Sequence, residues 1–252
     1  MSAAVDRMLA NWPALSSLYL KDARTALVRK HQFESWECYA LACLARAHYT
    51  VGSTLMLEDR ESDCATLTRV LYEHVIAFAW LMIDPAHHYQ RLVSWEKKER
   101  LKVVKGLARF IPGAPSEAEA TANLMTLGLD LAVPAAPETF DRAVQAQEFW
   151  QSRDTGCEFC FARNYECLFR TYSSYVHPTT AGLMQFFDPD PAGDPARPVR
   201  RHTGQIPAEA MLMFSDMLIV SAHSLGWPDR RQITRTLSNG VQHENRRGEN
   251  GE

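Results

Sequence analysis

An arginine, two serines and a histidine lie close together in segment 168–178, which reads LFRTYSSYVHP. Arg170 and His177 are seven residues apart, which is almost two helical turns, so they can share one face of a helix over about 10 Å. Ser173 and Ser174 lie between them. Because a guanidinium, hydroxyls and an imidazole can all bind phosphate oxygens, this polar stripe predicts a phosphate site.

The proline after His177 determines where this helix should end. Its ring disfavours helical geometry for the preceding residue, so we expect the helix to end at or near Val176. His177 would then lie at a helix C-terminus, whose partial negative charge favours the protonated imidazole. The departure from helical geometry also weakens the argument that His177 shares a face with Arg170.

Three roles are open to the polar stripe. In RNA cleavage, His177 would move a proton between the attacking 2′-hydroxyl and the leaving oxygen, while Arg170 stabilises the charge of the transition state. In a structural role, His177 would bond to carbonyls at the helix end and Arg170 would pair with Glu166, four residues earlier. In the third role, the same groups bind a ligand without chemistry.

A second arginine and histidine, Arg69 and His74, occur earlier in the chain. Five residues rotate a helix by about 500°, which leaves these two side chains roughly 140° apart. Glu73 faces Arg69 better, so we expect an intrahelical Arg69–Glu73 pair and a half-buried His74. The alternative is that this helix contributes Arg69 or Glu73 to the polar stripe around His177.

Cysteines near the same segment raise the question of a metal. Cys157 and Cys160 are three residues apart and Cys167 follows, so three thiolates could bind zinc if His177 supplied the fourth ligand. No second pair of cysteines is present, and buried helix cysteines are the ordinary case. The sequence also contains no glycine-rich phosphate loop, nucleophile elbow or metalloprotease motif. We therefore expect no metal and no cofactor.

Composition limits the class of protein. The chain has 252 residues, of which 46% are hydrophobic, and a formal net charge of −3. It can therefore bury one substantial core, and any site for a polyanion must be a local patch rather than a basic surface. We find no signal peptide and no apolar run of membrane-spanning length. We expect a soluble cytoplasmic protein without membrane contact, whose six cysteines are reduced.

Apolar residues recur at helical spacing almost throughout, and no run alternates as a strand would, so we predict an all-α fold. Ser116 and Glu119 have the spacing of a capping box at a helix start. A single domain is expected over 1–238, followed by a flexible tail over 239–252. The helices are expected over 15–30, 34–57, 61–83, about 86–109, 116 to about 129, 139–151, 157–176 and about 207–225.

The pattern around Arg170 resembles the HEPN superfamily of small α-helical bundles. Ribonucleases of that superfamily carry an arginine and a histidine separated by four to six residues, and Arg170 and His177 have six between them. A closer resemblance is to a bacterial family of uncharacterised, distantly HEPN-like proteins with an early arginine and glutamate and a later Tyr-x-x-Ser-x-x-x-His-Pro motif. Arg69 and Glu73 resemble the early pair, and the segment that ends at His177-Pro178 resembles the later motif.

This resemblance implies a HEPN-like core over about 62–183, a homodimer in which two such motifs meet, and metal-independent cleavage of RNA. The predicted catalytic residues are then Arg170, Ser173, Ser174 and His177, and the predicted binding residues are Arg69, Glu73, His74 and Tyr172. We expect an endoribonuclease or a toxin-like RNA-processing protein of bacterial stress or defence. The commonest catalytic members carry asparagine or aspartate after the arginine, where this chain has Thr171. The alternative is a non-catalytic module that binds an anionic ligand, a nucleotide or a regulatory protein partner.

Overall fold

The computed structural model of the chain describes residues 6, 9–23, 35–57, 60–107, 110–126, 132–153, 155, 158–176 and 205–225. Within these residues every regular element is a helix, which confirms the all-α prediction. The elements in chain order are α2 (Trp12–Leu18), the π-helix η1 (Tyr19–Ala23), α4 (Ser35–Met56), α5 (Glu61–Leu81), α6 (Pro85–Leu107), α7 (Glu117–Thr126), α8 (Thr139–Gln151), α9 (Phe161–Asn164), the π-helix η2 (Tyr165–Phe169), α10 (Arg170–Val176) and α12 (Gln205–Leu225). The expected tail over 239–252 lies outside the described residues.

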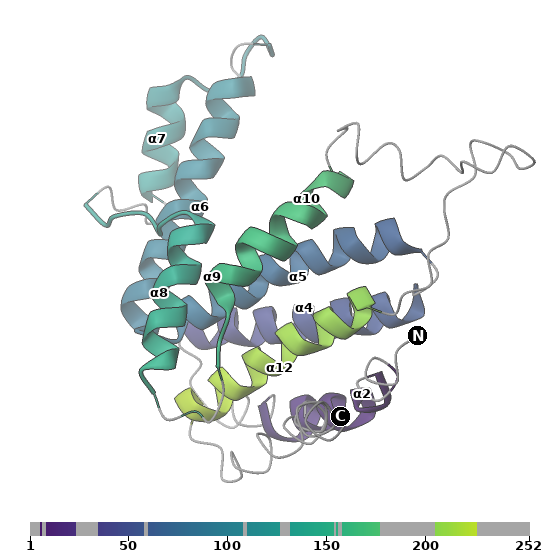
Figure 1. Ribbon diagram of the computed structural model, residues 1–252. Helices are drawn as coiled ribbons and strands as arrows, with labels where there is room; N and C mark the ends of the chain where they lie inside the picture. Colours follow the sequence, from purple (N-terminus) through teal and green to yellow (C-terminus); the bar gives the residue numbers. More distant parts are fainter. Residues whose placement is uncertain are drawn as a thin grey trace, which may run out of the picture.

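Helix α5 is the central element of the bundle. It packs against α4, α8, α10 and α12, and Figure 1 shows α4, α5 and α12 running side by side, with α10 next to α5 and the α6–α7 hairpin extending away from them. Every residue from Val75 to Leu81 is buried. A helix that is apolar on all sides must be covered on all sides, which is why several helices surround this half of α5. None of the described helices is long and apolar enough to cross a membrane.

The predicted helix bounds hold where the local signals are strong. Helix α8 spans Thr139–Gln151 as predicted. The capping box is present, because the Ser116 N–H donates to the Glu119 carboxylate at 2.8 Å and the Glu119 N–H donates to Ser116 Oγ at 3.3 Å. The predicted start of the first helix at residue 15 is wrong. Helix α2 begins at Trp12, because Pro13 lies in its first turn, where a fixed φ and a missing N–H favour a helix start.

The helix predicted over 157–176 begins later than expected, at Phe161. The backbone N–H of Ala162 donates to Oε1 of Gln147 on α8 at 2.9 Å. A side chain from the preceding helix thus satisfies one of the free amides of this helix start, and no local signal in the sequence predicts that contact. The helix then widens into the π-turn Tyr165–Phe169 before α10 begins.

Trp80 joins three helices at the centre of the bundle. Its side chain is fully buried, and its indole N–H donates to Oε1 of Gln145 on α8 at 2.8 Å. The imidazole of His88 on α6 stacks on the indole with a centroid distance of 3.8 Å, and His88 Nδ1 bonds to the Trp80 carbonyl at 2.6 Å. The guanidinium of Arg91 lies 5.3 Å from the indole centroid. The Trp80 side chain therefore contributes to the docking of both α6 and α8 on α5.

The buried His88 predicts that stability falls in mild acid. Burial lowers the pKa of His88 below its ordinary value, so the unfolded chain, with a histidine pKa of about 6.5, takes up the proton first as the pH falls. The stability that His88 contributes is thus present above about pH 6.5 and is lost as the pH falls below that value. Urea unfolding measures the free energy of unfolding near pH 7.5 and near pH 5.5. This free energy should fall less between the two pH values for His88→Gln than for the unchanged protein.

The matched control for this prediction is His87→Gln, because His87 is the exposed neighbour of His88. This variant should lose as much stability in acid as the unchanged protein. Burial also lowers the pKa of His48, so His48 should destabilise the protein in acid in the same way. The stability of His88→Gln should therefore keep part of its dependence on pH. If His88→Gln kept all of it, the neutral buried imidazole would not be its source.

Candidate functional site

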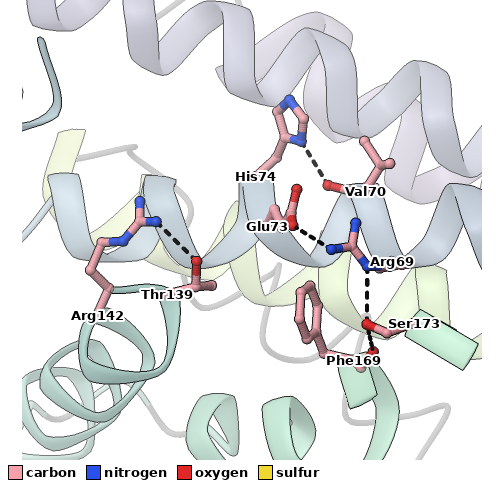
Figure 2. Close-up of polar contacts among 8 residues, drawn as sticks. All are labelled: Arg69, Val70, Glu73, His74, Thr139, Arg142, Phe169 and Ser173. Atoms are coloured by element: carbon pink, nitrogen blue, oxygen red, sulfur yellow. Dashed lines mark hydrogen bonds and ion pairs between the residues drawn. The ribbon is translucent and has the colours of Figure 1, made fainter. Parts of the chain in front are cut away.

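The two sequence patterns that suggested a site meet where α10 packs on α5. The Nε–H of Arg69 on α5 donates to Oγ of Ser173 on α10 at 3.1 Å, and its Nη2 lies 3.2 Å from Oε1 of Glu73 (Figure 2). The guanidinium also lies 4.6 Å from the ring centroid of Phe169. Arg69 and Ser173 are 104 residues apart in the chain. The helical spacing predicted the Arg69–Glu73 pair, and the tertiary packing adds Ser173 to it.

Two tyrosines of α10 form hydrogen bonds to neighbouring helices, one to α12 and one to α5. The Tyr172 hydroxyl, which is buried, donates to the Glu209 carboxylate of α12. The Tyr175 hydroxyl donates to Oε1 of Glu61 at the start of α5 at 3.0 Å. Burial and the hydrogen-bonded carboxylate of Glu209 raise the pKa of Tyr172, so this hydroxyl stays protonated and acts as a donor. The predicted binding residue Tyr172 therefore holds α10 against α12.

Aromatic packing supports the other end of α10. The rings of Tyr165 and Phe169, at the two ends of the π-turn, stack with centroids 4.6 Å apart. Both rings contact the buried ring of Tyr72 on α5, at 6.4 and 6.0 Å. Because π-turns occur often at functional sites, the irregular backbone next to Arg69 is consistent with a site at this helix crossing.

Arg170 lies in a different environment from Ser173. Its Nε lies 3.0 Å from Oε2 of Glu166, and the two side chains are 66% and 41% exposed. The Ser174 hydroxyl donates to the Thr171 carbonyl at 2.7 Å. Of the predicted stripe, Ser173 thus bonds to α5, whereas Arg170 pairs along its own helix at the surface.

The two predicted histidines have separate outcomes. His74 is half-buried, as expected, and its Nδ1 bonds to the Val70 carbonyl of the preceding turn at 2.7 Å (Figure 2). His177, the residue after the last position of α10, lies outside the described residues. The structure therefore places Arg69, Glu73 and Ser173 together, whereas Arg170 is exposed at the start of α10.

Two charged residues that the sequence analysis did not single out are buried or partly buried in the bundle. Arg142 on α8 is only 7% exposed. Asp216 on α12 is partly buried near Tyr72 and Cys160, and burial raises its pKa to about 7. Asp216 could have been found as the only acid in the apolar stretch 210–222. Arg142 could not, because an arginine in an amphipathic helix normally faces solvent.

The zinc alternative rested on cysteines around α9. Cys160 is half-buried and Cys167 is exposed, while Cys157 and His177 lie outside the described residues. Among the residues that the structure describes, no three histidine, cysteine, aspartate or glutamate side chains gather as metal ligands. Burial raises the pKa of the Cys160 thiol, which disfavours the thiolate that a metal requires.

Comparison with known proteins places the chain in a family. A family model matches residues 37–194, more than half of the chain, and the matched part includes both Arg69 and Ser173. No curated protein and no solved structure matches the chain. The match agrees with the expected resemblance to uncharacterised proteins. The chain belongs to the family of unknown function DUF5677.

Proposed function

We propose that this protein is a HEPN-like, metal-independent endoribonuclease or RNA-processing protein of bacterial stress or defence, and that its site lies on α10. The observation that carries the proposal is the Arg69–Ser173 hydrogen bond. It brings the early arginine–glutamate pair to the helix that precedes His177. Two segments with little else in common in the sequence thus contribute polar groups to one helix crossing.

Arg170 is available to an RNA phosphate. Its ion pair with Glu166 lies at the surface, and exposed pairs of this kind contribute only about 0–1 kcal/mol. A phosphate group can form two parallel hydrogen bonds with a guanidinium, so it can replace Glu166 as the partner of Arg170. The tyrosine hydrogen bonds of α10 hold this helix in place while the phosphate binds.

In this proposal, Arg170 and His177 divide the chemistry between them. The 2′-oxygen of the ribose forms a bond to phosphorus as the bond from phosphorus to the 5′-oxygen breaks. His177 takes the proton from the 2′-hydroxyl and delivers it to the leaving 5′-oxygen, and Arg170 stabilises the charge on the phosphate oxygens. Arg69 and Glu73 are positioning residues, because they hold α10 through Ser173. A cytoplasmic homodimer would supply a second α10, and with it both reacting groups twice.

The second candidate is a module that binds an anionic ligand or a nucleotide without cleaving it, or that binds a protein partner. One observation favours it: the Thr171 hydroxyl, in the position after Arg170, donates to the Cys167 carbonyl at 2.5 Å, so it is not free to assist a reaction. Binding with little turnover would follow.

A cleavage assay with a matched pair of variants separates the two candidates. A mixed pool of RNA molecules is incubated in the presence of EDTA with the unchanged protein, with Arg170→Ala or with Arg163→Ala. The products are then resolved on a denaturing gel. Arg163 is exposed on α9, seven residues before Arg170, and serves as the control for lost surface charge. The ribonuclease proposal expects cleavage by the unchanged protein and Arg163→Ala and a strong loss in Arg170→Ala. Equal activity of all three would remove Arg170 from the mechanism.

The variant Glu166→Gln tests the role of Arg170 by freeing its guanidinium instead of removing it. Loss of its carboxylate leaves Arg170 without its partner, so RNA affinity should rise by about 1.5- to 5-fold, the factor that corresponds to an exposed pair. Fluorescence anisotropy with a labelled oligoribonucleotide measures the change. If no cleavage occurs while nucleotides raise the melting temperature of the protein, the binding module replaces the ribonuclease as the function.

A further inference from the structure

The hairpin tip, residues 100–116, carries positive charge at the end of a protruding element. It contains four basic residues and no acidic residue, although the whole chain has a net charge of −3. The basic residues are Arg100, Lys102, Lys105 and Arg109. Figure 1 shows that the α6–α7 hairpin extends away from the bundle. The hairpin tip is therefore a local basic patch of the kind that a chain of negative net charge needs in order to bind a polyanion.

Apolar side chains are exposed at the same tip. Phe110, in the turn after α6, is 84% exposed, and Val103, Leu107 and Ile111 beside it are 45–61% exposed. The backbone N–H groups of Phe110 and Ile111 both donate to the Leu107 carbonyl, at 3.0 and 2.9 Å, so the turn is held at the end of α6. Large apolar side chains gathered at a surface mark a contact with a ligand or a partner.

The hairpin displays this tip as an ordered element that adds little to the core. Within α7 only Ala120 is buried. The Ser116–Glu119 capping box fixes the start of α7, and the ion pair between Lys105 and Glu117 joins α7 to α6. Burial in the bundle therefore does not account for the apolar residues of the tip, and a binding role does.

The cations of the tip have exposed carboxylate partners. Arg100 pairs with Glu96, Lys102 with Glu99 and Lys105 with Glu117, and all six side chains are at least 40% exposed. Ion pairs this exposed contribute little to stability, so a phosphate can replace the carboxylate. The hairpin also stays positive when every acid is counted, because residues 96–119 contain six basic and four acidic residues, a net charge of +2.

We infer that the hairpin tip binds single-stranded RNA, with Arg100 and Lys102 on phosphates and Phe110 stacked on a base. Lysine and arginine neutralise phosphates, and aromatic and other apolar side chains pack on the faces of unpaired bases. A second copy of the chain fits less well, because its tip carries the same positive charge. The inference rests on the proposed function and adds to it a second contact with the RNA, on helices other than α10.

Fluorescence anisotropy with a labelled, non-cleavable 2′-O-methyl oligonucleotide tests the stacking contact. Phe110→Ala should weaken binding by about 5- to 150-fold, the range for the loss of one stacked base, and Phe110→Trp should retain the affinity. The matched control is Tyr49→Ala, because Tyr49 is a 67% exposed aromatic residue on α4. This control should bind as tightly as the unchanged protein. If Phe110→Ala also binds as tightly, no base stacks on this ring and the inference is overturned.

The dependence of affinity on salt concentration tests the phosphate contacts. In a plot of log affinity against log salt concentration, Arg100→Gln/Lys102→Gln should have a slope about 1.4 smaller in magnitude, because each contact with a single strand contributes about 0.7. Lys21→Gln/Arg46→Gln removes one lysine and one arginine that are exposed elsewhere and should leave the slope unchanged. Equal slopes for both double variants would contradict the proposed contacts.

A cleavage assay of the same variants separates this inference from the ribonuclease proposal. Loss of affinity in Phe110→Ala without any RNA cleavage by the unchanged protein supports the hairpin site and removes the ribonuclease. Cleavage with unchanged affinity in both hairpin variants overturns the hairpin site and leaves the ribonuclease. Flotation with phosphatidylserine vesicles, or self-association in sedimentation, that Phe110→Ala abolishes without a change in RNA affinity would assign the tip to a lipid surface or a second copy and overturn the inference.

Discussion

His177→Ala is expected to lower the rate constant of RNA cleavage in EDTA by about 10²–10⁴-fold, the usual contribution of a general acid–base residue. Alanine cannot take the proton from the 2′-hydroxyl or return it to the 5′-oxygen. The proposed phosphate contact of Arg170 would remain, so RNA affinity should change much less than the rate. Single-turnover kinetics with a labelled oligoribonucleotide measures the rate constant, and anisotropy with a non-cleavable 2′-deoxy analogue measures the affinity.

Two controls make this result specific. His87→Ala removes an exposed histidine of α6 and should leave the rate unchanged. The double variant Arg170→Ala/His177→Ala should be little slower than the slower single variant, because residues that act as a unit in one transition state lose their effects together. If His177→Ala cleaves as fast as the unchanged protein, another residue transfers the proton and the proposed mechanism is wrong.

Trp80→Ala is expected to lower the free energy of unfolding by about 3–5 kcal/mol, the cost of truncating a large aromatic side chain in a packed core. The indole is fully buried. Its loss leaves the Gln145 side chain without its donor and removes the surface on which His88 stacks. Urea unfolding followed by circular dichroism near pH 7.5 measures the change.

The controls for Trp80 vary the ring and its burial. Trp80→Phe keeps an aromatic surface for His88 but loses the indole N–H, so it should cost less than Trp80→Ala. Phe110→Ala removes an aromatic side chain that is 84% exposed in the α6–α7 connection, and should change stability by no more than about 0.5 kcal/mol. A loss below about 1 kcal/mol in Trp80→Ala would contradict the view that this side chain joins α5, α6 and α8.

Helical spacing was enough to predict the contacts that stay within one helix. The Arg69–Glu73 and Arg170–Glu166 pairs follow from a separation of four residues, and the Ser116–Glu119 capping box follows from a separation of three. Such pairs depend only on the geometry of the helix that carries them. They were therefore accessible without knowledge of how the helices pack.

The contacts between helices required the tertiary structure. The late start of α9 depends on Gln147, and the position of α10 depends on Arg69 and Glu209. No local pattern specifies which face of one helix meets which face of another, because that choice is made by the burial of the whole apolar surface.

By itself, the sequence determined that the chain is helical and which polar residues share a turn, because the repeat of apolar residues and the spacing of charges act over a few residues. Only the tertiary structure decided that Arg69 meets Ser173 and that Arg142 is buried. Both outcomes depend on residues brought together from distant parts of the chain. The physical reason is that burial and desolvation are properties of the packed bundle and not of any one helix.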